Sequence, residues 1–238
     1  MILVRSLAFA AFFYGWSVLI ILAMTLVFWG PTTWGLGWAR LWNRGTIWGL
    51  KRICAIEVEV RGVENIPAGP AIVAANHQCM FDAFAPLSHL PKPSMAGKRE
   101  LTRIPLFGWY AVRNRLMVVV DRDGHAGALR RLIAQAQAML AEGRQLLIYP
   151  QGTRLAPGET APYKPGVAGL YGLLGAACVP MATNAGLCWP PHGILRRPGR
   201  IVFQYLEPIP PGLKRAAFMA ELETRIETAA KALMAEGR

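Results

Sequence analysis

The most constraining feature of this sequence is an uncharged, apolar stretch near its amino terminus. No charged side chain occurs between Arg5 and Arg40, and residues 7–29 are long enough for a helix of roughly 35 Å. Such a helix can span a bilayer or enter it deeply. A signal peptide has a shorter apolar segment and a cleavage site of small residues, and buried helices of soluble domains rarely extend this far without a charge. We therefore expect residues 1–54 to form a membrane anchor.

Basic residues are concentrated on the carboxyl-terminal side of the apolar stretch. Only Arg5 and the amino terminus precede it. The basic residues that follow it are Arg40, Arg44, Lys51, Arg52 and Arg61. Because positive charge is retained on the cytoplasmic side, this asymmetry predicts that the rest of the chain lies at the cytoplasmic face of the membrane. We expect that membrane to be a bacterial inner membrane.

The segment after the apolar stretch has the pattern of an interfacial helix. At about 100° per residue, its large apolar side chains fall within one arc of roughly 120°, beside a basic face. These side chains are Trp34, Trp38, Leu41, Trp42 and Trp48. The alternative is that the rings pack against the folded domain, and four glycines between residues 35 and 49 argue against one continuous helix. The pattern leaves open whether the first segment crosses the bilayer or turns back with the second as a monotopic two-helix anchor.

The composition excludes several classes of protein. A length of 238 residues suits one sizeable domain with an appendage, and 53% hydrophobic against 17% charged residues excludes a disordered protein. The net charge of +12 favours anionic partners. No nucleic-acid-binding module accompanies that charge, so we expect no nucleic acid partner. The four cysteines form neither a CxxC pair nor a cluster with zinc spacing, so no disulfide framework and no metal site is predicted.

From residue 55 onward, short β-prone runs alternate with helical patterns, which predicts a layered α/β domain over residues 55–238. The predicted strands are residues 56–60, 71–75, 117–120, 145–149, 179–183 and 201–206. The best-supported helices are residues 126–141 and 213–235. Most of the polar motifs follow the end of a predicted strand, where open α/β sheets bind their ligands.

The first motif places a histidine and an aspartate just after the strand at residues 71–75. His77 and Asp82 are five residues apart, an offset that on a regular helix would turn the two side chains about 140° away from each other. We therefore expect His77 in an irregular turn before a helix that carries Asp82. In that geometry the carboxylate holds one ring N–H and leaves the other nitrogen free to take a proton. Cys79 has no feature that would lower its pKa, and we interpret it as a packed side chain.

The second motif follows the strand at residues 145–149 and contains Gln151, Gly152, Thr153 and Arg154. Glycine lets backbone N–H groups approach an anion, threonine adds a hydroxyl donor, and arginine offers a planar fork that matches phosphate oxygens. The alternative is a plain surface turn with a solvated arginine. Position and residue types together favour an anion site.

In their order and spacing these blocks resemble the 1-acylglycerol-3-phosphate acyltransferase family of membrane lysophospholipid acyltransferases. Residues 76–82 match that family's NHxxxxD block, and residues 149–154 stand at its block of FPEGTR type. Residues 98–108 resemble its KxEL…P..G stretch, residues 118–122 its FIDR strand end, and residues 179–181 its proline-containing block. The similarity extends over residues 58–210, most of the predicted α/β domain.

The resemblance implies a layered α/β fold of the glycerol-3-phosphate acyltransferase type with an amino-terminal membrane-associated helical anchor. It implies that His77 is the general base and that Asp82 orients it. It also implies a set of substrate-binding residues, most of them around the acceptor's phosphate: Asn76, Lys98, Arg122, Gln151, Gly152, Thr153 and Arg154.

Two positions depart from the family pattern. Gln151 stands where the family usually has glutamate, and Leu116 stands where a glycine commonly precedes the FIDR strand. The glutamine removes a charge, keeps an acceptor and adds two donors. It therefore puts the identity of the acceptor headgroup in question.

The implied function is transfer of an acyl chain from an acyl thioester to a lysophospholipid hydroxyl, with 1-acylglycerol-3-phosphate as the first candidate acceptor and phosphatidic acid as the product. The thioester, of coenzyme A or acyl carrier protein, is a co-substrate, and no metal or other cofactor is expected. Membrane lipid is an expected partner. The alternatives are acylation of another lyso-lipid, such as a lyso-aminolipid, and a non-catalytic lipid-binding membrane protein.

Overall fold

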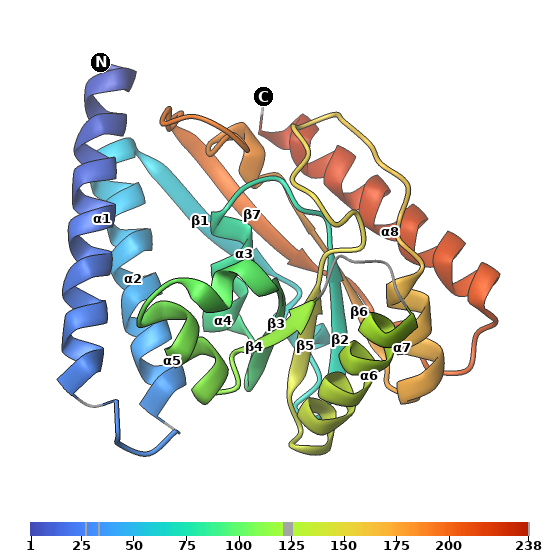
Figure 1. Cartoon of the computed structure of the whole chain (residues 1–238). Helices are drawn as coiled ribbons and strands as arrows, with labels where there is room; N and C mark the ends of the chain where they lie inside the picture. The colour runs from blue at the N-terminus through green and yellow to red at the C-terminus, as the bar shows by residue number, and fades with distance from the viewer. Residues whose placement is uncertain (27, 33, 121–125, 238) are drawn as a thin grey trace.

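The computed structural model describes residues 1–26, 28–32, 34–120 and 126–237. A seven-stranded sheet has helices on both faces, and two long helices lie side by side at one end (Figure 1). The elements are, in chain order, α1 (Ile2–Leu26), α2 (Trp34–Cys54), β1 (Ile56–Arg61), η1 (Val63–Asn65), β2 (Ala71–Ala75), α3 (Phe81–Phe84), α4 (Pro86–His89), β3 (Pro93–Lys98), η2 (Arg99–Arg103), α5 (Phe107–Arg113), β4 (Met117–Val120), α6 (Ala126–Ala141), β5 (Gln145–Ile148), α7 (Gly166–Leu174), β6 (Cys178–Thr183), η3 (Ala185–Leu187), β7 (Gly199–Tyr205) and α8 (Arg215–Glu236).

The strands are ordered β1-β7-β6-β2-β5-β3-β4. The five strands from β6 to β4 are parallel, whereas β7 runs antiparallel to β6 and parallel to β1. The carboxyl ends of β6, β2, β5, β3 and β4 therefore lie at one edge of the sheet. This arrangement confirms the predicted layered α/β fold.

All six predicted strands and both predicted helices are present, with ends displaced by no more than two residues. Strand β3 was not predicted, because its residues PSMAGK contain proline and glycine and no β-branched side chain. Neighbouring strands stabilise it instead, since β3 pairs with both β4 and β5. A side chain at Gly97 would meet Met117, so a small residue is required at that register position.

The sheet separates two hydrophobic clusters. Successive residues of β2 point to opposite faces, so Val73 packs with α1 and α2 while Ile72 packs with α6, α7 and α8. The first cluster includes Phe9 of α1 and Leu50 of α2. The two amino-terminal helices are therefore packed onto the sheet and share its core.

Helix α1 is apolar on all sides but is buried on one side only. Its buried residues Ser6, Phe9, Phe13 and Ile20 lie on the face toward α2 and the sheet. Most of the remaining side chains are exposed, which accounts for much of the exposed hydrophobic surface of the described residues. Within those residues, α1 is the one helix that is long and apolar enough to cross a membrane.

Some tryptophans of α2 pack against the folded domain, and others face outward as expected of an interfacial helix. Trp42 is half-buried, packs edge-on against Phe84 and donates its indole N–H to Ser17 Oγ at 2.9 Å. Trp34 and Trp48 are more than half exposed, at 51% and 54%. One part of the aromatic arc thus packs against the protein, and another part faces outward.

The glycines of residues 35–49, which argued against one continuous helix, do not interrupt α2, because it is continuous from Trp34 to Cys54. Two of these glycines allow close approach of α1. An added Cβ at Gly45 would lie 2.3 Å from the Trp16 ring, and one at Gly49 would lie 2.4 Å from the Phe12 ring. Tight packing between the helices offsets the helix-propensity cost of glycine, which is about 1 kcal/mol per residue.

We predict that Gly45→Ala destabilises the protein relative to Gly37→Ala. Both changes raise the helix propensity of α2, but a Cβ at Gly37 has no atom within 4 Å, whereas one at Gly45 collides with Trp16. The overpacked variant should lose about 1–3 kcal/mol of unfolding free energy. Thermal and urea unfolding of the two variants in detergent measure this difference, and equal stabilities would contradict the packing described.

Candidate active site

The predicted functional residues lie at the carboxyl edge of the parallel strands. His77 follows β2 and residues 151–154 follow β5, two neighbouring strands, while Lys98 is the last residue of β3. A backbone hydrogen bond of 2.8 Å from the Leu155 N–H to the His77 carbonyl joins the first two segments directly. Arg122, another predicted phosphate-binding residue, lies outside the described residues.

His77 occupies an irregular turn, and Asp82 lies in the first turn of the short helix α3, which is the geometry expected from their spacing. The His77 Nδ1 atom is 2.6 Å from Asp82 Oδ1. The other carboxylate oxygen, Oδ2, accepts the backbone N–H groups of Gln78 and Cys79 at 2.7 and 2.8 Å. Asp82 is fully buried, and these three hydrogen bonds compensate its carboxylate.

This geometry leaves one ring nitrogen of His77 available for chemistry. Because an ionised carboxylate only accepts hydrogen bonds, Nδ1 carries the proton and Nε2 holds the lone pair. The His77 side chain is 18% exposed, so the ring is enclosed but accessible. The pair therefore has the form of a histidine base oriented by a buried acid.

Tyr149, the first residue after β5, supports the ring from one side. Its ring stacks on His77 with centroids 4.2 Å apart and an interplanar angle of 25°. Its hydroxyl donates to the Asp82 carbonyl oxygen at 2.6 Å. Burial raises the pKa of Tyr149 well above its usual value, with a further contribution from Asp82, so the hydroxyl stays protonated and remains a donor.

Cys79 does not have the environment of a nucleophile. Its side chain is completely buried, and burial together with the neighbouring Asp82 carboxylate raises the pKa of the thiol well above its usual value. A buried thiol of this kind stays protonated and unreactive at neutral pH. The site therefore offers a base, not an activated cysteine.

Asn76 and Gln151 are buried residues whose amides are engaged within the protein. Asn76 exchanges two hydrogen bonds with the backbone of Thr183, donating to its carbonyl at 2.9 Å and accepting its N–H at 2.8 Å. Gln151 Oε1 accepts the backbone N–H of His77 at 2.9 Å. Both side chains hold the histidine turn in place against neighbouring strands.

The segment after Gln151 has the features of an anion site. Gly152 has a φ of +68°, and an added Cβ would lie 2.7 Å from Lys164 Nζ, so the lysine side chain lies over this glycine. Thr153 and Arg154 are exposed, and Arg154 forms no hydrogen bond or ion pair with the part of the chain that the structure describes. A hydroxyl and two cations at a glycine turn are together suited to an anion.

Comparison with known proteins agrees with these motifs. A model of the acyltransferase family matches residues 57–184, which include both His77 and Arg154. This chain belongs to the acyltransferase family.

Curated relatives of this chain include 1-acyl-sn-glycerol-3-phosphate acyltransferase from Pseudomonas aeruginosa. It is 35% identical over 160 residues, which cover 67% of this chain and 62% of that protein. A lyso-ornithine lipid O-acyltransferase from the same organism is 33% identical over 117 residues, 47% of this chain and 42% of that protein. The chain thus matches about two-fifths to three-fifths of the length of these relatives.

The fold is also that of a solved structure. The crystal structure of the 1-acyl-sn-glycerophosphate acyltransferase PlsC from Thermotoga maritima superimposes with a TM-score of 0.82. The alignment covers 98% of each chain at 22% sequence identity. The likeness extends over the two amino-terminal helices as well as the sheet.

Three side chains of this candidate site were not predicted from the sequence. Tyr149 could have been suspected, because it is an aromatic residue between a strand and the PQGTR motif. Tyr163 and Glu227 carry no such signal. Their side chains meet in space, with the Tyr163 hydroxyl donating to Glu227 Oε1 at 2.9 Å across 64 residues of sequence.

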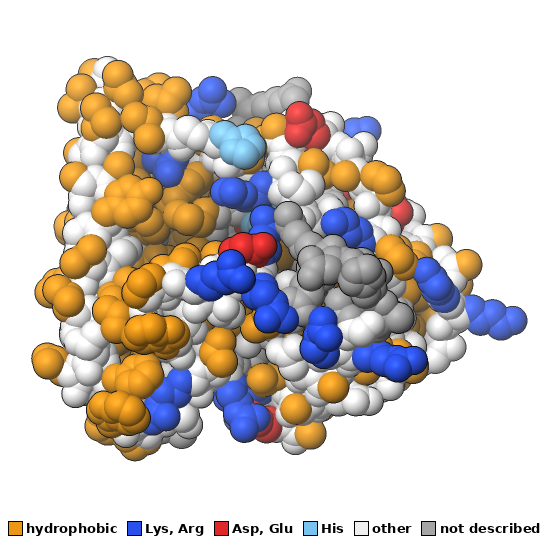
Figure 2. Space-filling model, in the orientation of Figure 1, with side chains coloured by type: hydrophobic (Ala, Val, Ile, Leu, Met, Phe, Trp, Pro, Cys, Tyr) orange, Lys and Arg blue, Asp and Glu red, His pale blue; other side chains and the backbone are white. Residues whose placement is uncertain are grey.

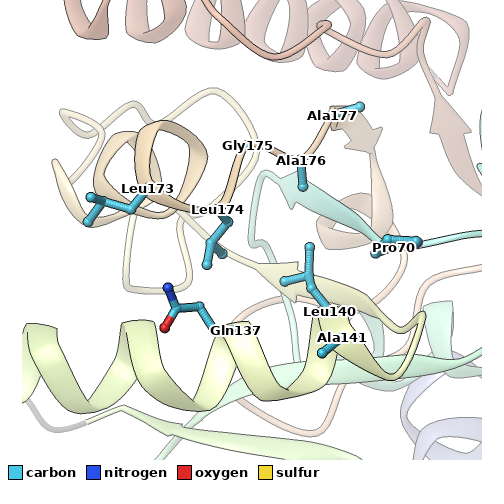
Figure 3. Close-up of a pocket in the computed structure, with 9 residues that line it drawn as sticks. All are labelled: Pro70, Gln137, Leu140, Ala141, Leu173, Leu174, Gly175, Ala176 and Ala177. Carbon is cyan, nitrogen blue, oxygen red and sulfur yellow. The ribbon is translucent and has the colours of Figure 1, made fainter.

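The protein also has a cavity of about 430 Å³ that is remote from these residues. Figure 3 shows its lining, which comes from the ends of α6 and α7 and from the segments that enter β2 and β6. It therefore lies at the amino ends of these strands, at the opposite edge of the sheet from His77. None of the described residues that line it is ionisable, so they provide no base for acyl transfer.

Proposed function

We propose that this protein is a membrane-bound O-acyltransferase that moves an acyl chain from a thioester to the free hydroxyl of a lysophospholipid. The first candidate acceptor is 1-acylglycerol-3-phosphate, which would give phosphatidic acid. The observation that carries the proposal is the His77–Asp82 pair, 2.6 Å apart, placed directly beside the loop of Thr153 and Arg154. The names of several curated relatives support the same acceptor.

In the proposed reaction, His77 Nε2 removes the proton of the glycerol hydroxyl as its oxygen attacks the thioester carbonyl carbon. The carbon–sulfur bond then breaks, an ester forms, and the leaving thiolate takes the proton from the imidazolium. Asp82 keeps the proton on Nδ1 and stabilises the positive charge that develops on the ring. No acyl-enzyme is needed, in agreement with the buried, protonated Cys79.

The acceptor's phosphate would be held by the cationic loop. Arg154 offers a fork of N–H donors, Thr153 adds a hydroxyl, and Lys164 places a second cation over Gly152. Lys98 ends the neighbouring strand at the same edge. Fixing the phosphate brings the hydroxyl to His77, and such positioning supplies much of the rate enhancement of a direct transfer.

Membrane attachment through α1 and α2 belongs to the same proposal. Side chains on the outer face of α1, such as Leu7, Val18 and Leu22, are more than half exposed. Figure 2 shows hydrophobic side chains over this end of the molecule, with Lys and Arg gathered beside them. A hydrophobic surface next to a basic one suits a bilayer with anionic headgroups, from which the acceptor would enter the site.

A lyso-aminolipid acceptor is the second candidate. It is favoured by the similarity to the lyso-ornithine lipid O-acyltransferase. The donor is an acyl thioester of coenzyme A or of acyl carrier protein. A panel of lyso-acceptors given to the purified protein with each donor, with products identified by mass spectrometry, discriminates between these possibilities.

We predict that His77→Ala and Asp82→Asn each reduce acyl transfer by about 10²–10⁴-fold while the proteins remain folded. Loss of the base or of its orienting carboxylate removes proton transfer from the hydroxyl. Cys79→Ala is the control and should keep most of its activity, because the thiol has no part in the reaction. Product formation is measured in detergent micelles, and full activity in both variants of the pair would refute the proposed mechanism.

A second prediction concerns the phosphate. Arg154→Ala should raise the KM for 1-acylglycerol-3-phosphate by about tenfold or more, since a charged hydrogen bond contributes about 1.5–3 kcal/mol. Arg215→Ala removes the same charge from an exposed position at the start of α8 and should leave the KM unchanged. Equal KM values for the two variants would show that Arg154 does not bind the acceptor.

A further inference from the structure

Gln151 links the histidine turn to a carboxylate on α8. Its Oε1 accepts the backbone N–H of His77 at 2.9 Å, and its Nε2 donates to Glu227 Oε1 at 3.2 Å. The same Glu227 oxygen accepts the Tyr163 hydroxyl at 2.9 Å. A short chain of hydrogen bonds therefore runs from Tyr163 and α8 to the backbone of the proposed base.

These hydrogen-bonded side chains are not accessible to substrate. Gln151 is 4% exposed, and the cavity between its side chain, His77 and Glu227 measures about 10 Å³, room for about one water molecule. An acceptor headgroup does not fit there. The departure from glutamate at position 151 thus has to be explained by its protein partners.

The direction of each hydrogen bond requires an amide at position 151. Glu227 already accepts from Tyr163, whose pKa is raised by burial and by the neighbouring Glu227, so the phenol stays a donor. Gln151 can accept from His77 at one end and donate to Glu227 at the other. A carboxylate at position 151 would have no donor for Glu227 and would place two negative charges at hydrogen-bonding distance.

The surrounding charges would not relieve that repulsion. The small cavity is lined by Glu159 from the loop after β5 and by His77, and no Lys or Arg is among its lining residues. Glu223 lies one turn earlier on α8 and adds negative charge near Tyr163. Lys164 lies over Gly152 and does not line this cavity.

We propose that Gln151 and Glu227 are a matched pair of positioning residues, with the amide in the loop and the carboxylate on α8. The pair fixes the backbone of His77, and through it the aim of the ring, without touching substrate. This inference rests on the proposed role of His77 as a base. On this proposal, glutamine stands in place of the family's usual glutamate because it supports the base, and not because it recognises the acceptor headgroup.

A charge-exchange series tests the proposal. Gln151→Glu should lower kcat about tenfold at alkaline pH, with little change in the acceptor KM, because the two carboxylates repel each other there. The loss should diminish as the pH falls, since the paired carboxyls then share one proton and the protonated group can donate as the amide did. The alkaline limb of the pH profile is therefore the diagnostic one.

The double variant Gln151→Glu with Glu227→Gln exchanges the donor and the acceptor of the hydrogen bond between residues 151 and 227. It should recover kcat to within about threefold of the original protein. Gln151→Glu with Glu223→Gln is the matched control. It removes the same charge from an exposed position one turn away on α8 and should recover nothing. The thermal unfolding temperature of each variant across the same pH range reports on the pairing of residues 151 and 227, and this measurement does not depend on activity.

Failure of the double variant to recover activity, with its unfolding temperature restored, would overturn the positioning role. A Gln151→Glu variant whose kcat and pH profile are unchanged would overturn it as well. A rise in the acceptor KM with unchanged kcat would instead make Gln151 a headgroup-binding residue. If the unaltered protein transfers no acyl chain to any acceptor, the proposed function fails, and the unfolding series alone still decides whether the two residues are paired.

Discussion

The buried carboxylate of Asp82 is the interaction on which the rest of this site depends. Removing a carboxylate from water costs several kcal/mol unless hydrogen bonds compensate it. Here the compensation comes from the His77 ring and from two consecutive backbone N–H groups of the turn. The same contacts that make the charge tolerable therefore fix the shape of the turn and the orientation of the ring. Stability of the turn and orientation of the base have a single physical origin.

The topology of the sheet brings the remaining groups to this pair. Because β2, β5 and β3 are parallel neighbours, segments that are far apart in the sequence leave the sheet at the same edge. Asn76 joins the end of β2 to Thr183 at the end of β6 through hydrogen bonds. Gln151 joins the end of β2 to α8 in the same way. The cationic loop and the base are thus held by the regular elements of the fold, while α1 and α2 attach an exposed apolar surface to the same sheet.

The sequence predicted the parts of this arrangement that depend on local pattern. Alternating and apolar runs located the strands, and the five-residue offset of His77 and Asp82 predicted a turn followed by a helix. It did not predict β3, which is stabilised by its neighbours and not by its own propensity. Glu227 was missed because a surface-helix glutamate has no distinguishing pattern until tertiary packing places it against Gln151. The α2 glycines were misread for the same reason, since their role is set by the rings of α1.

Nitrogen-15 NMR of the histidine-labelled protein tests the central claim most directly. In the neutral ring of His77, assigned by its loss in His77→Gln, the account predicts a proton on Nδ1, hydrogen-bonded to Asp82, and an unprotonated Nε2. The exposed His192 provides an internal reference for an unconstrained ring. A neutral His77 ring with its proton on Nε2, or a tautomer mixture like that of His192, would contradict the account.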